Sequence, residues 1–463
     1  MTDLAALTAA EMSAGYRAGR FTPVDVAEAA LARIAALDPL INAVVHIDPV
    51  AVRRQAEQAY RAVREGVDLP LVGIPVGVKD IIDVAGVPTT CHSHLMLDNI
   101  AATDAEPVRR LRAAGSIILC KLATHEFALG GPSFDLPFPP ARNPWNIDQN
   151  PGGSSSGSGA AVAAGFMPIT LGTDTAGSIR HPAGACGVLG LKPTYDAISR
   201  EGTFPLAASL DHVGPLAREV SDLREAFLAM AGREGKGPDA PSRTGRAADT
   251  LRIGYVRHFH AEDIVASDDV ATALDRVADH LATAGLHVEE VRLPPLQAFL
   301  AASRVILHHE AFAVHAEWLR TRPESYGALG RQRLMAGAFL GADDYHRART
   351  LKAKLGAALD ESFSRFDVLL TANMMDAPCR IDDAAELVRT GTRQARAPFN
   401  MSGHPALSIV TGFTPASLPL GGQLIARHGR EDDLFALAGL LEPMCRLAPL
   451  GMAASERTAS IPG

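Results

Sequence analysis

The sequence predicts an α/β fold in which helices cover a central sheet. Short apolar runs, typical of buried strands, alternate with longer stretches whose apolar residues repeat at helical spacing. The chain has 463 residues, of which 47% are hydrophobic and 21% charged, so it can bury a large core. It contains neither a complete dinucleotide-binding fingerprint nor a phosphate loop ending in Gly-Lys-Ser/Thr, and no cofactor is predicted.

The first 70 residues are predicted to be helical. Thr22 is a suitable N-cap and Pro23 suits the first helical position, so a helix is expected over 24–37. Pro49 opens a further helix that ends at Arg64. From residue 74 the pattern changes to strands, expected at 74–78, 116–120, 167–171 and 188–191, with a helix at 104–114.

A hydrophilic span rich in Gly and Pro, GREGKGPDAPSRTGRAADT at 232–250, divides the rest of the chain. We interpret it as a surface connection between a core at 71–231 and a second half at 251–463; a division into two domains is the alternative. The second half is expected to hold strands at 251–256, 368–371, 405–410 and 421–426 and helices at 270–284, 300–320, 342–365 and from 432 onward.

Charge and cysteine content argue against several classes of protein. The net charge is −8 and no basic cluster occurs, so no nucleic-acid partner is expected. The N-terminus lacks a basic start followed by an apolar run, and no long uncharged apolar run follows, so a cytoplasmic protein without a membrane partner is expected. The five cysteines are scattered, which favours reduced thiols. Cys91-His92-Ser93-His94 has no zinc-site spacing, and no metal is predicted.

Two loops rich in serine or glycine flank a stretch of small apolar residues. The first, Pro151–Gly159, has four serines and four glycines in nine positions, a composition kept where backbone amides must closely approach another group. The second, Asp174–Ser178, follows a predicted strand and precedes a short predicted helix. A serine at such a junction presents its hydroxyl beside free backbone amides, so Ser178 is a candidate nucleophile.

Lys79 is the candidate base. It closes an apolar strand and is followed, after Asp80, by two isoleucines, which indicates burial. Desolvation lowers the pKa of a lysine from about 10.4 towards neutrality, and a neutral lysine can accept a proton. Considered alone, Lys79 could equally be a lysine whose charged end reaches solvent at a strand end.

Three segments together resemble the amidase signature family: GVKD at Lys79, PGGSSSGSGAA at Ser154 and GTDTAGSIRHPAG at Ser178. The resemblance extends over nearly the whole chain through the segments NPW from 143, GVLGLKPT from 187 and PFNMSGHPAL from 398. It implies one amidase domain over 1–463, a large α/β/α domain with a central mixed sheet.

The resemblance also implies a Ser-cisSer-Lys triad. Ser178 would attack a carbonyl carbon, and Ser154, after a cis peptide bond to Gly153, would take the proton of Ser178 while passing its own to neutral Lys79. The amides of Thr175, Ala176, Gly177 and Ser178 would form the oxyanion hole. Ser155, Asp174 and Arg180 would hold the two loops together.

The implied activity is the hydrolysis of carbon–nitrogen bonds in small amides through an acyl-enzyme. The substrate pocket is expected to be mainly apolar, with contributions from Phe127, Phe134, Phe138, Phe204, Met374 and Met375. A carbamate or urea-derivative hydrolase of the same family, and the A-type component of a glutamyl-tRNA amidotransferase working in a complex, are alternatives. A catalytically silent scaffold is a third, which the intact Lys79, Ser154 and Ser178 set argues against. A small-molecule amide or carbamate is the expected partner, and a homodimer is possible in this family.

Overall fold

A central sheet runs through the computed structural model, which describes residues 3–233 and 247–445. Within these residues, eleven strands form one sheet in the order β1-β3-β2-β4-β6-β5-β10-β11-β9-β7-β8. The strands are β1 (Val44–His46), β2 (Pro75–Lys79), β3 (Ile117–Leu122), β4 (Ile169–Asp174), β5 (Leu189–Lys192), β6 (His212–Ala217), β7 (Arg252–Tyr255), β8 (His287–Glu290), β9 (Val368–Ala372), β10 (Ala406–Phe413) and β11 (Pro419–Ala426).

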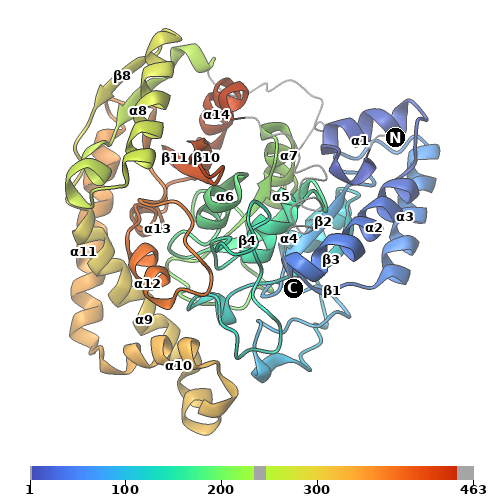
Figure 1. Ribbon diagram of the computed structural model, residues 1–463, viewed down its shortest axis with the longest axis horizontal. Coiled ribbons are helices and arrows are strands. Elements are labelled where there is room, and N and C mark those ends of the chain that lie inside the picture. Colours follow the sequence, from blue (N-terminus) through green and yellow to red (C-terminus); the bar gives the residue numbers. More distant parts are fainter. Residues whose placement is uncertain (1–2, 234–246, 446–463) are drawn as a thin grey trace.

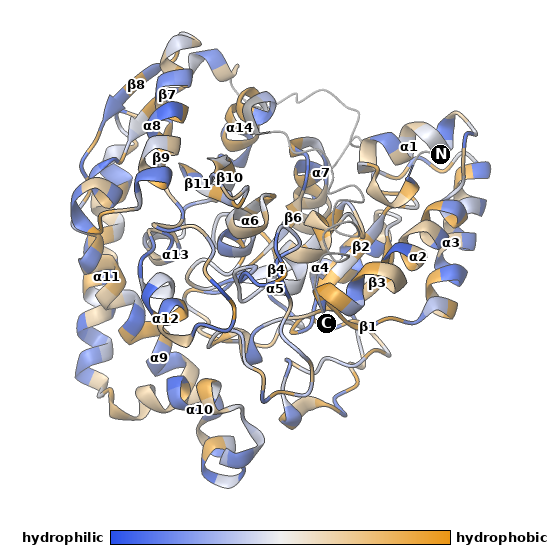
Figure 2. Ribbon diagram, in the orientation of Figure 1, coloured by the Kyte–Doolittle hydropathy of each residue, from blue (hydrophilic) through white to orange (hydrophobic). Residues whose placement is uncertain are grey.

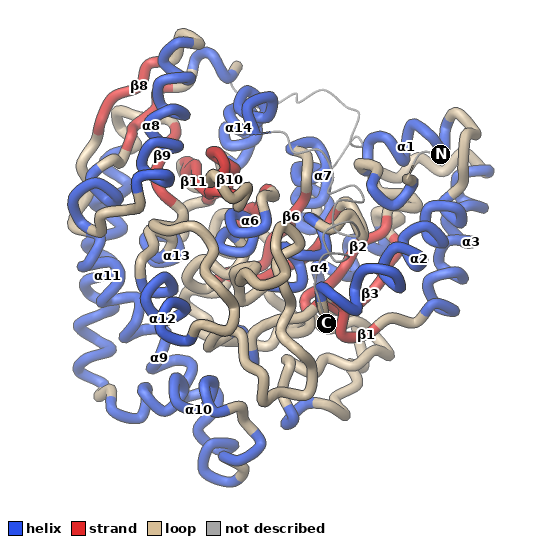
Figure 3. The backbone as a smooth tube through the Cα atoms, viewed as in Figure 1, coloured by secondary structure: helices blue, strands red, loops and turns tan. Residues whose placement is uncertain are grey.

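The sheet is mixed, as expected. β2 is parallel to both β3 and β4, and β7 is parallel to β8 and β9. Antiparallel pairs join β1 to β3, β4 to β6, β6 to β5, β5 to β10, β10 to β11 and β11 to β9. Because β5 pairs with β10, strands from before and after the 232–250 span belong to the same sheet. Figure 3 shows the red strands running between the helices.

Helices surround this sheet. They are α1 (Ala9–Arg17), α2 (Pro23–Ile41), α3 (Pro49–Arg64), α4 (Glu106–Ala113), α5 (Ser156–Ala163), α6 (Arg180–Cys186), α7 (Val220–Ala231), α8 (Asp268–Thr283), α9 (Leu296–Thr321), α10 (Ala328–Met335), α11 (Ala342–Ser362), α12 (Ala384–Thr392), α13 (Ala397–Ser402) and α14 (Glu431–Cys445). In Figure 1, α1, α2 and α3 lie at one side of the molecule and α8, α9 and α11 at the other. Figure 2 shows hydrophilic residues on the peripheral helices α3 and α8. None of the described helices combines the length and apolar character needed to span a bilayer.

The α/β fold and the predicted strands are confirmed, with ends that move by up to three residues. Three strands escaped prediction. β6 contains Gly214 and Pro215, which weaken a strand pattern, yet it is buried between β4 and β5. β1 has only three residues, and β8 is a short, largely exposed edge strand. Most of the predicted surface connection lies outside the described residues; Ala248–Thr250 forms a short 3₁₀ turn.

Small residues bring the first Ser-rich loop close to the sheet. α5 has the sequence SGSGAAVA and is buried along its whole length. A Cβ at Gly157 would lie 2.5 Å from the backbone nitrogen of Ala123 and 2.5 Å from the carbonyl oxygen of Ala43. Only a residue without a side chain permits this approach. The composition noted in the sequence therefore places the start of α5 directly against the chain that follows β3.

Candidate active site

Lys79 lies at the end of a strand that is buried at every position. β2 pairs with β3 and β4, and the Lys79 side chain is 0% exposed. Its Nζ atom donates to Ser154 Oγ at 2.7 Å and to Thr173 Oγ1 at 2.7 Å. Burial lowers the pKa of Lys79 to about 7, against a smaller opposing effect of Asp174 and Asp211. About half of the molecules therefore carry a neutral amine here at pH 7.

The first Ser-rich loop is fixed from several sides. The Gly153–Ser154 peptide bond is cis, which confirms what the family resemblance implied. The backbone N–H of His125 donates to the carbonyl oxygen of Ser154 at 3.1 Å, and a Cβ at Gly153 would collide with the His125 ring at 2.1 Å. His125 was not singled out in the sequence, because no motif surrounds it.

Ser155 joins the two Ser-rich loops to β4. Its hydroxyl donates to the Thr173 carbonyl oxygen at 3.1 Å and accepts from the Thr173 N–H at 3.2 Å. Its own backbone N–H donates to the carbonyl oxygen of Ser178 at 3.1 Å. The structure therefore brings Lys79, Ser154, Ser155 and Ser178, which are far apart in the sequence, into one site.

A buried ion pair organises the second loop. Arg180 donates to both carboxylate oxygens of Asp174, at 3.0 Å each, and both side chains are 0% exposed. Burial acts to raise the pKa of Asp174, but the charge and hydrogen bonds of Arg180 outweigh it and hold the pKa below its usual value. Asn400 Nδ2 donates to Asp174 Oδ1 at 2.8 Å, and Gln423 Oε1 accepts from Arg180 at 2.7 Å. Asn400 and Gln423 bring the C-terminal third to the site.

One of the predicted oxyanion-hole amides is already engaged. The N–H of Gly177 donates to Asp174 Oδ1 at 2.7 Å, so it is not a free donor in this structure, and this part of the prediction needs correction. The carboxylate shapes the turn by taking that amide. Ala176 and Ser178 are partly exposed, whereas Thr175 is buried and its hydroxyl donates to Asp211 at 2.7 Å. Among the described residues, no hydrogen bond connects the hydroxyls of Ser154 and Ser178, which places them in one site without direct contact.

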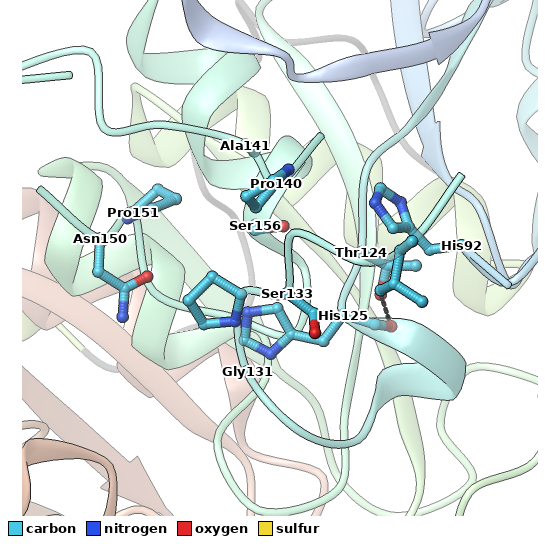
Figure 4. A pocket seen from close by; sticks show the side chains of 12 residues that line it. His92, Thr124, His125, Gly131, Ser133, Pro140, Ala141, Asn150, Pro151 and Ser156 are labelled. Carbon is cyan, nitrogen blue, oxygen red and sulfur yellow. Dashed lines mark hydrogen bonds between the residues drawn. The ribbon is translucent and has the colours of Figure 1, made fainter. Parts of the chain in front are cut away.

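Three cavities border the two loops. Figure 4 shows the smallest, about 10 Å³, where Thr124, His125 and Ser156 face Pro151 of the first loop. A second, of about 100 Å³, is lined by Thr173, Thr175, Phe204 and Asp211 among others. The third, of about 500 Å³, begins at Ala176. It is lined by Leu129, Ala176, Leu300, Ser303, Arg304, Leu307, His308, Leu329, Gln332, Arg333, Ala336, Val388, Gly391, Thr392, Gln394, Arg396 and Ala397.

Of the six side chains predicted for a substrate pocket, Phe204 lines one of these three cavities. Phe127 is buried, with its ring centroid 5.1 Å from that of Phe204 and 4.5 Å from that of His315. Met374 and Met375 are buried in the interior, and Phe134 is 60% exposed. The carbonyl oxygen of Phe138 accepts from His92 Nε2 at 3.0 Å. The sequence therefore located the right segments but mostly missed the side chains that face the cavities.

One group of potential metal ligands occurs among the described residues, and it is formed by other segments: Asp360, His404 and His428. No sequence motif indicates it, because the three residues are far apart in the chain and have no spacing in common with zinc-binding motifs.

Comparisons with known proteins agree on one group. A family model described as Amidase matches residues 25–435. The A-type component of the glutamyl-tRNA(Gln) amidotransferase from Roseiflexus sp. (strain RS-1) is 36% identical over 470 residues, covering 94% of this chain and 96% of that protein. The corresponding component from Symbiobacterium thermophilum is 34% identical, with 93% and 95% covered.

Solved structures give the same result. A chain from a vestigial protein complex connected with the origins of an s-triazine catabolic enzyme has a TM-score of 0.86 at 32% identity, covering 96% of this chain and 100% of that chain. The peptide amidase of Stenotrophomonas maltophilia has a TM-score of 0.80 at 28% identity, with 96% and 98% covered.

Proposed function

The chain belongs to the amidase signature family, whose hydrolases act on carbon–nitrogen bonds, and from this premise we propose that it cleaves small amides through an acyl-enzyme on Ser178. The observation that carries the proposal is the contact between Lys79 Nζ and Ser154 Oγ, at 2.7 Å, in a fully buried position. A lysine with a pKa of about 7 can exchange protons at physiological pH, which an ordinary lysine does poorly.

In the proposed reaction, Ser178 Oγ attacks the substrate carbonyl carbon. Its proton passes to Ser154 Oγ while the Ser154 proton passes to the neutral amine of Lys79. The ammonium then returns a proton through Ser154 to the departing nitrogen, and the carbon–nitrogen bond breaks. Water attacks the resulting ester and releases the acid, regenerating Ser178. Thr173, which also accepts from Lys79, holds the amine in position for both transfers.

Backbone amides would stabilise the negative charge that develops on the carbonyl oxygen. Thr175, Ala176 and Ser178 remain as candidate donors once Gly177 is bound to Asp174. Fixed amides suit this purpose because they do not titrate and do not need to reorganise during the reaction. Asp174 and Arg180 then act as positioning residues, since they set the shape of the 174–180 turn.

The cavity that begins at Ala176 indicates the kind of substrate. Its wall is apolar at five leucine and valine side chains, in line with a mainly apolar amide, but Arg304, Arg333 and Arg396 also line it, and none of its described lining residues is acidic. Arg333 is close enough to contribute to the lowered pKa of His125, although burial is the larger cause. We therefore favour an amide whose apolar part carries a negatively charged group. Carbamates and urea derivatives present the same carbonyl chemistry and are the alternative substrates.

The experiment that tests the proposal uses a serine-directed fluorophosphonate and mass spectrometry of the purified chain, with hydrolysis of p-nitroanilides as the second readout. We expect one label on Ser178, absent in Ser178→Ala and slowed in Lys79→Ala. Ser133→Ala is the matched control, because Ser133 is also a partly buried serine that lines a cavity at the first loop. A folded wild-type chain that neither labels nor hydrolyses overturns the proposal.

The curated relatives favour one second candidate function. Their name describes one component of a larger enzyme, the glutamyl-tRNA(Gln) amidotransferase. If this chain works in that way, it will release ammonia from glutamine only with its partner proteins present. Hydrolysis of simple anilides by the chain alone, with glutamine left intact, decides for the free-standing amidase.

A further inference from the structure

Three side chains from separate segments converge on one point beside the sheet. Asp360 lies near the end of α11, His404 follows α13, and His428 follows β11. His404 Nε2 is 3.0 Å from Asp360 Oδ1, and His428 Nε2 is 3.8 Å from the same oxygen. The two imidazole centroids are only 3.9 Å apart. Phe363 also packs on His404, with centroids 4.9 Å apart.

These distances match the edges of a metal coordination shell. An ion about 2.1 Å from each ligand atom separates neighbouring ligand atoms by about 3.0 Å at a right angle and about 3.4 Å at the tetrahedral angle. The ligand atoms of Asp360, His404 and His428 all lie within 4.8 Å of one another. Small side-chain rotations of the two exposed members would therefore bring all three onto one ion, while His404 stays fixed by its surroundings.

The protonation state of the site suits a metal. Burial, followed by the positive charges of His428 and Lys192, lowers the pKa of His404 to about 2. Burial also lowers the pKa of His428, with Asp360 and Glu431 opposing and Lys192 assisting. Both rings are therefore neutral at pH 7, and a neutral imidazole has the lone pair that a metal requires.

The ordinary hydrogen bond between His404 and Asp360 leaves part of this arrangement unexplained. Among the described residues, His404 Nδ1 is buried without a hydrogen-bond partner, and His428 has no polar contact shorter than the 3.8 Å to Asp360. Two neutral rings that share one carboxylate gain little from each other as hydrogen-bonding groups. A single ion would engage all three residues together.

We propose that Asp360, His404 and His428 form a binding site for a divalent transition-metal ion, best suited to Zn²⁺. Two imidazoles and one carboxylate favour Zn²⁺, Ni²⁺ or Cu²⁺ over Mg²⁺ and Ca²⁺, which prefer oxygen ligands. Asp360 and His428 are 58% and 44% exposed at their side chains, so the ion can enter from solvent and complete its shell with water. The bound ion would join α11 to the loops that precede β10 and follow β11.

The site is separate from the proposed catalytic residues, so its function would be structural. None of the three ligands lines the cavities at the Ser-rich loops. The ion would hold together three segments that meet only in the folded chain, and it would therefore raise the thermal midpoint.

The test uses the full chain after treatment with a chelator. Equilibrium dialysis against ZnCl₂ and elemental analysis should give one tightly bound Zn²⁺, and Co²⁺ should produce visible absorption bands. Zinc should also raise Tm by a few degrees. His428→Ala and Asp360→Asn, both at exposed positions, should weaken binding at least tenfold and abolish the shift in Tm.

His287→Ala is the matched control. His287 is an exposed histidine 3.5 Å from a carboxylate, that of Glu289, in the same kind of pair but without a third ligand. Its replacement should leave zinc binding unchanged. Absence of zinc binding in the wild type, or equal binding in all variants, overturns the proposal, and hydrolytic activity has no part in either result.

Discussion

Replacement of Lys79 by methionine is expected to abolish hydrolysis and, at the same time, to stabilise the fold. Lys79 is fully buried and has no carboxylate within hydrogen-bond distance among the described residues; its partners are the hydroxyls of Ser154 and Thr173. Burial of an ammonium without a paired charge opposes folding. Methionine has a similar length and no charge, so the variant removes this cost and keeps the volume filled.

The magnitude follows from the pKa. A fall from the ordinary 10.5 to about 7 corresponds to about 5 kcal/mol. Loss of the lysine leaves two buried hydroxyls without their donor, which costs roughly 2–3 kcal/mol in total. The expected net gain is about 2 kcal/mol at neutral and lower pH. The folded-state pKa lies below the unfolded-state pKa, so the gain is constant below about pH 7 and falls by about 1.4 kcal/mol for each pH unit above it.

Urea unfolding at pH 6, 7.5 and 9 measures this dependence. Lys121→Met is the matched control: Lys121 is 1% exposed but forms an ion pair with Asp80 at 3.0 Å. Its loss leaves Asp80 buried without a partner charge and should cost about 3–5 kcal/mol. A Lys79→Met variant that is less stable than wild type at pH 6, or whose stability difference does not change with pH, refutes the reasoning.

Four further outcomes are expected. The kcat/KM for a neutral anilide should rise with pH around a midpoint near 7, as Lys79 loses its proton, and a profile flat from pH 5 to 9 would contradict its function as the base. Asp174→Asn leaves Arg180 without its carboxylate and should lower the free energy of unfolding by about 3–5 kcal/mol in urea titrations. Gly157→Ala should reduce Tm and soluble yield because its Cβ meets backbone atoms at 2.5 Å, whereas Gly439→Ala, in α14 with nothing within 4 Å, should be neutral or stabilising. Arg333→Gln should raise KM about tenfold for a p-nitroanilide with a carboxylate on its acyl chain and leave KM for the uncharged analogue unchanged, and equal effects on both would rule out an anion contact.

Much of the fold was readable because its signals are local. Pro49 and the polar residue before it define the start of α3, and its predicted end at Arg64 is also confirmed. Buried strands such as β2 and β9 are apolar runs whose length alone separates them from helices. β6 was missed for the opposite reason: Gly214 and Pro215 are unfavourable in an isolated strand, and only pairing with β4 and β5 holds them there.

The sequence by itself determined the fold class, the family, and the residues Lys79, Ser154 and Ser178 as one candidate site, because short motifs retain their spacing whatever surrounds them. Only the tertiary structure decided that Thr173 shares the amine of Lys79, that Asp174 occupies the amide of Gly177, and that Asn400 completes the same network. It alone brought Asp360, His404 and His428 together. Such contacts arise from the packing of segments far apart in the chain, and no local pattern of residues records which distant segment will lie opposite.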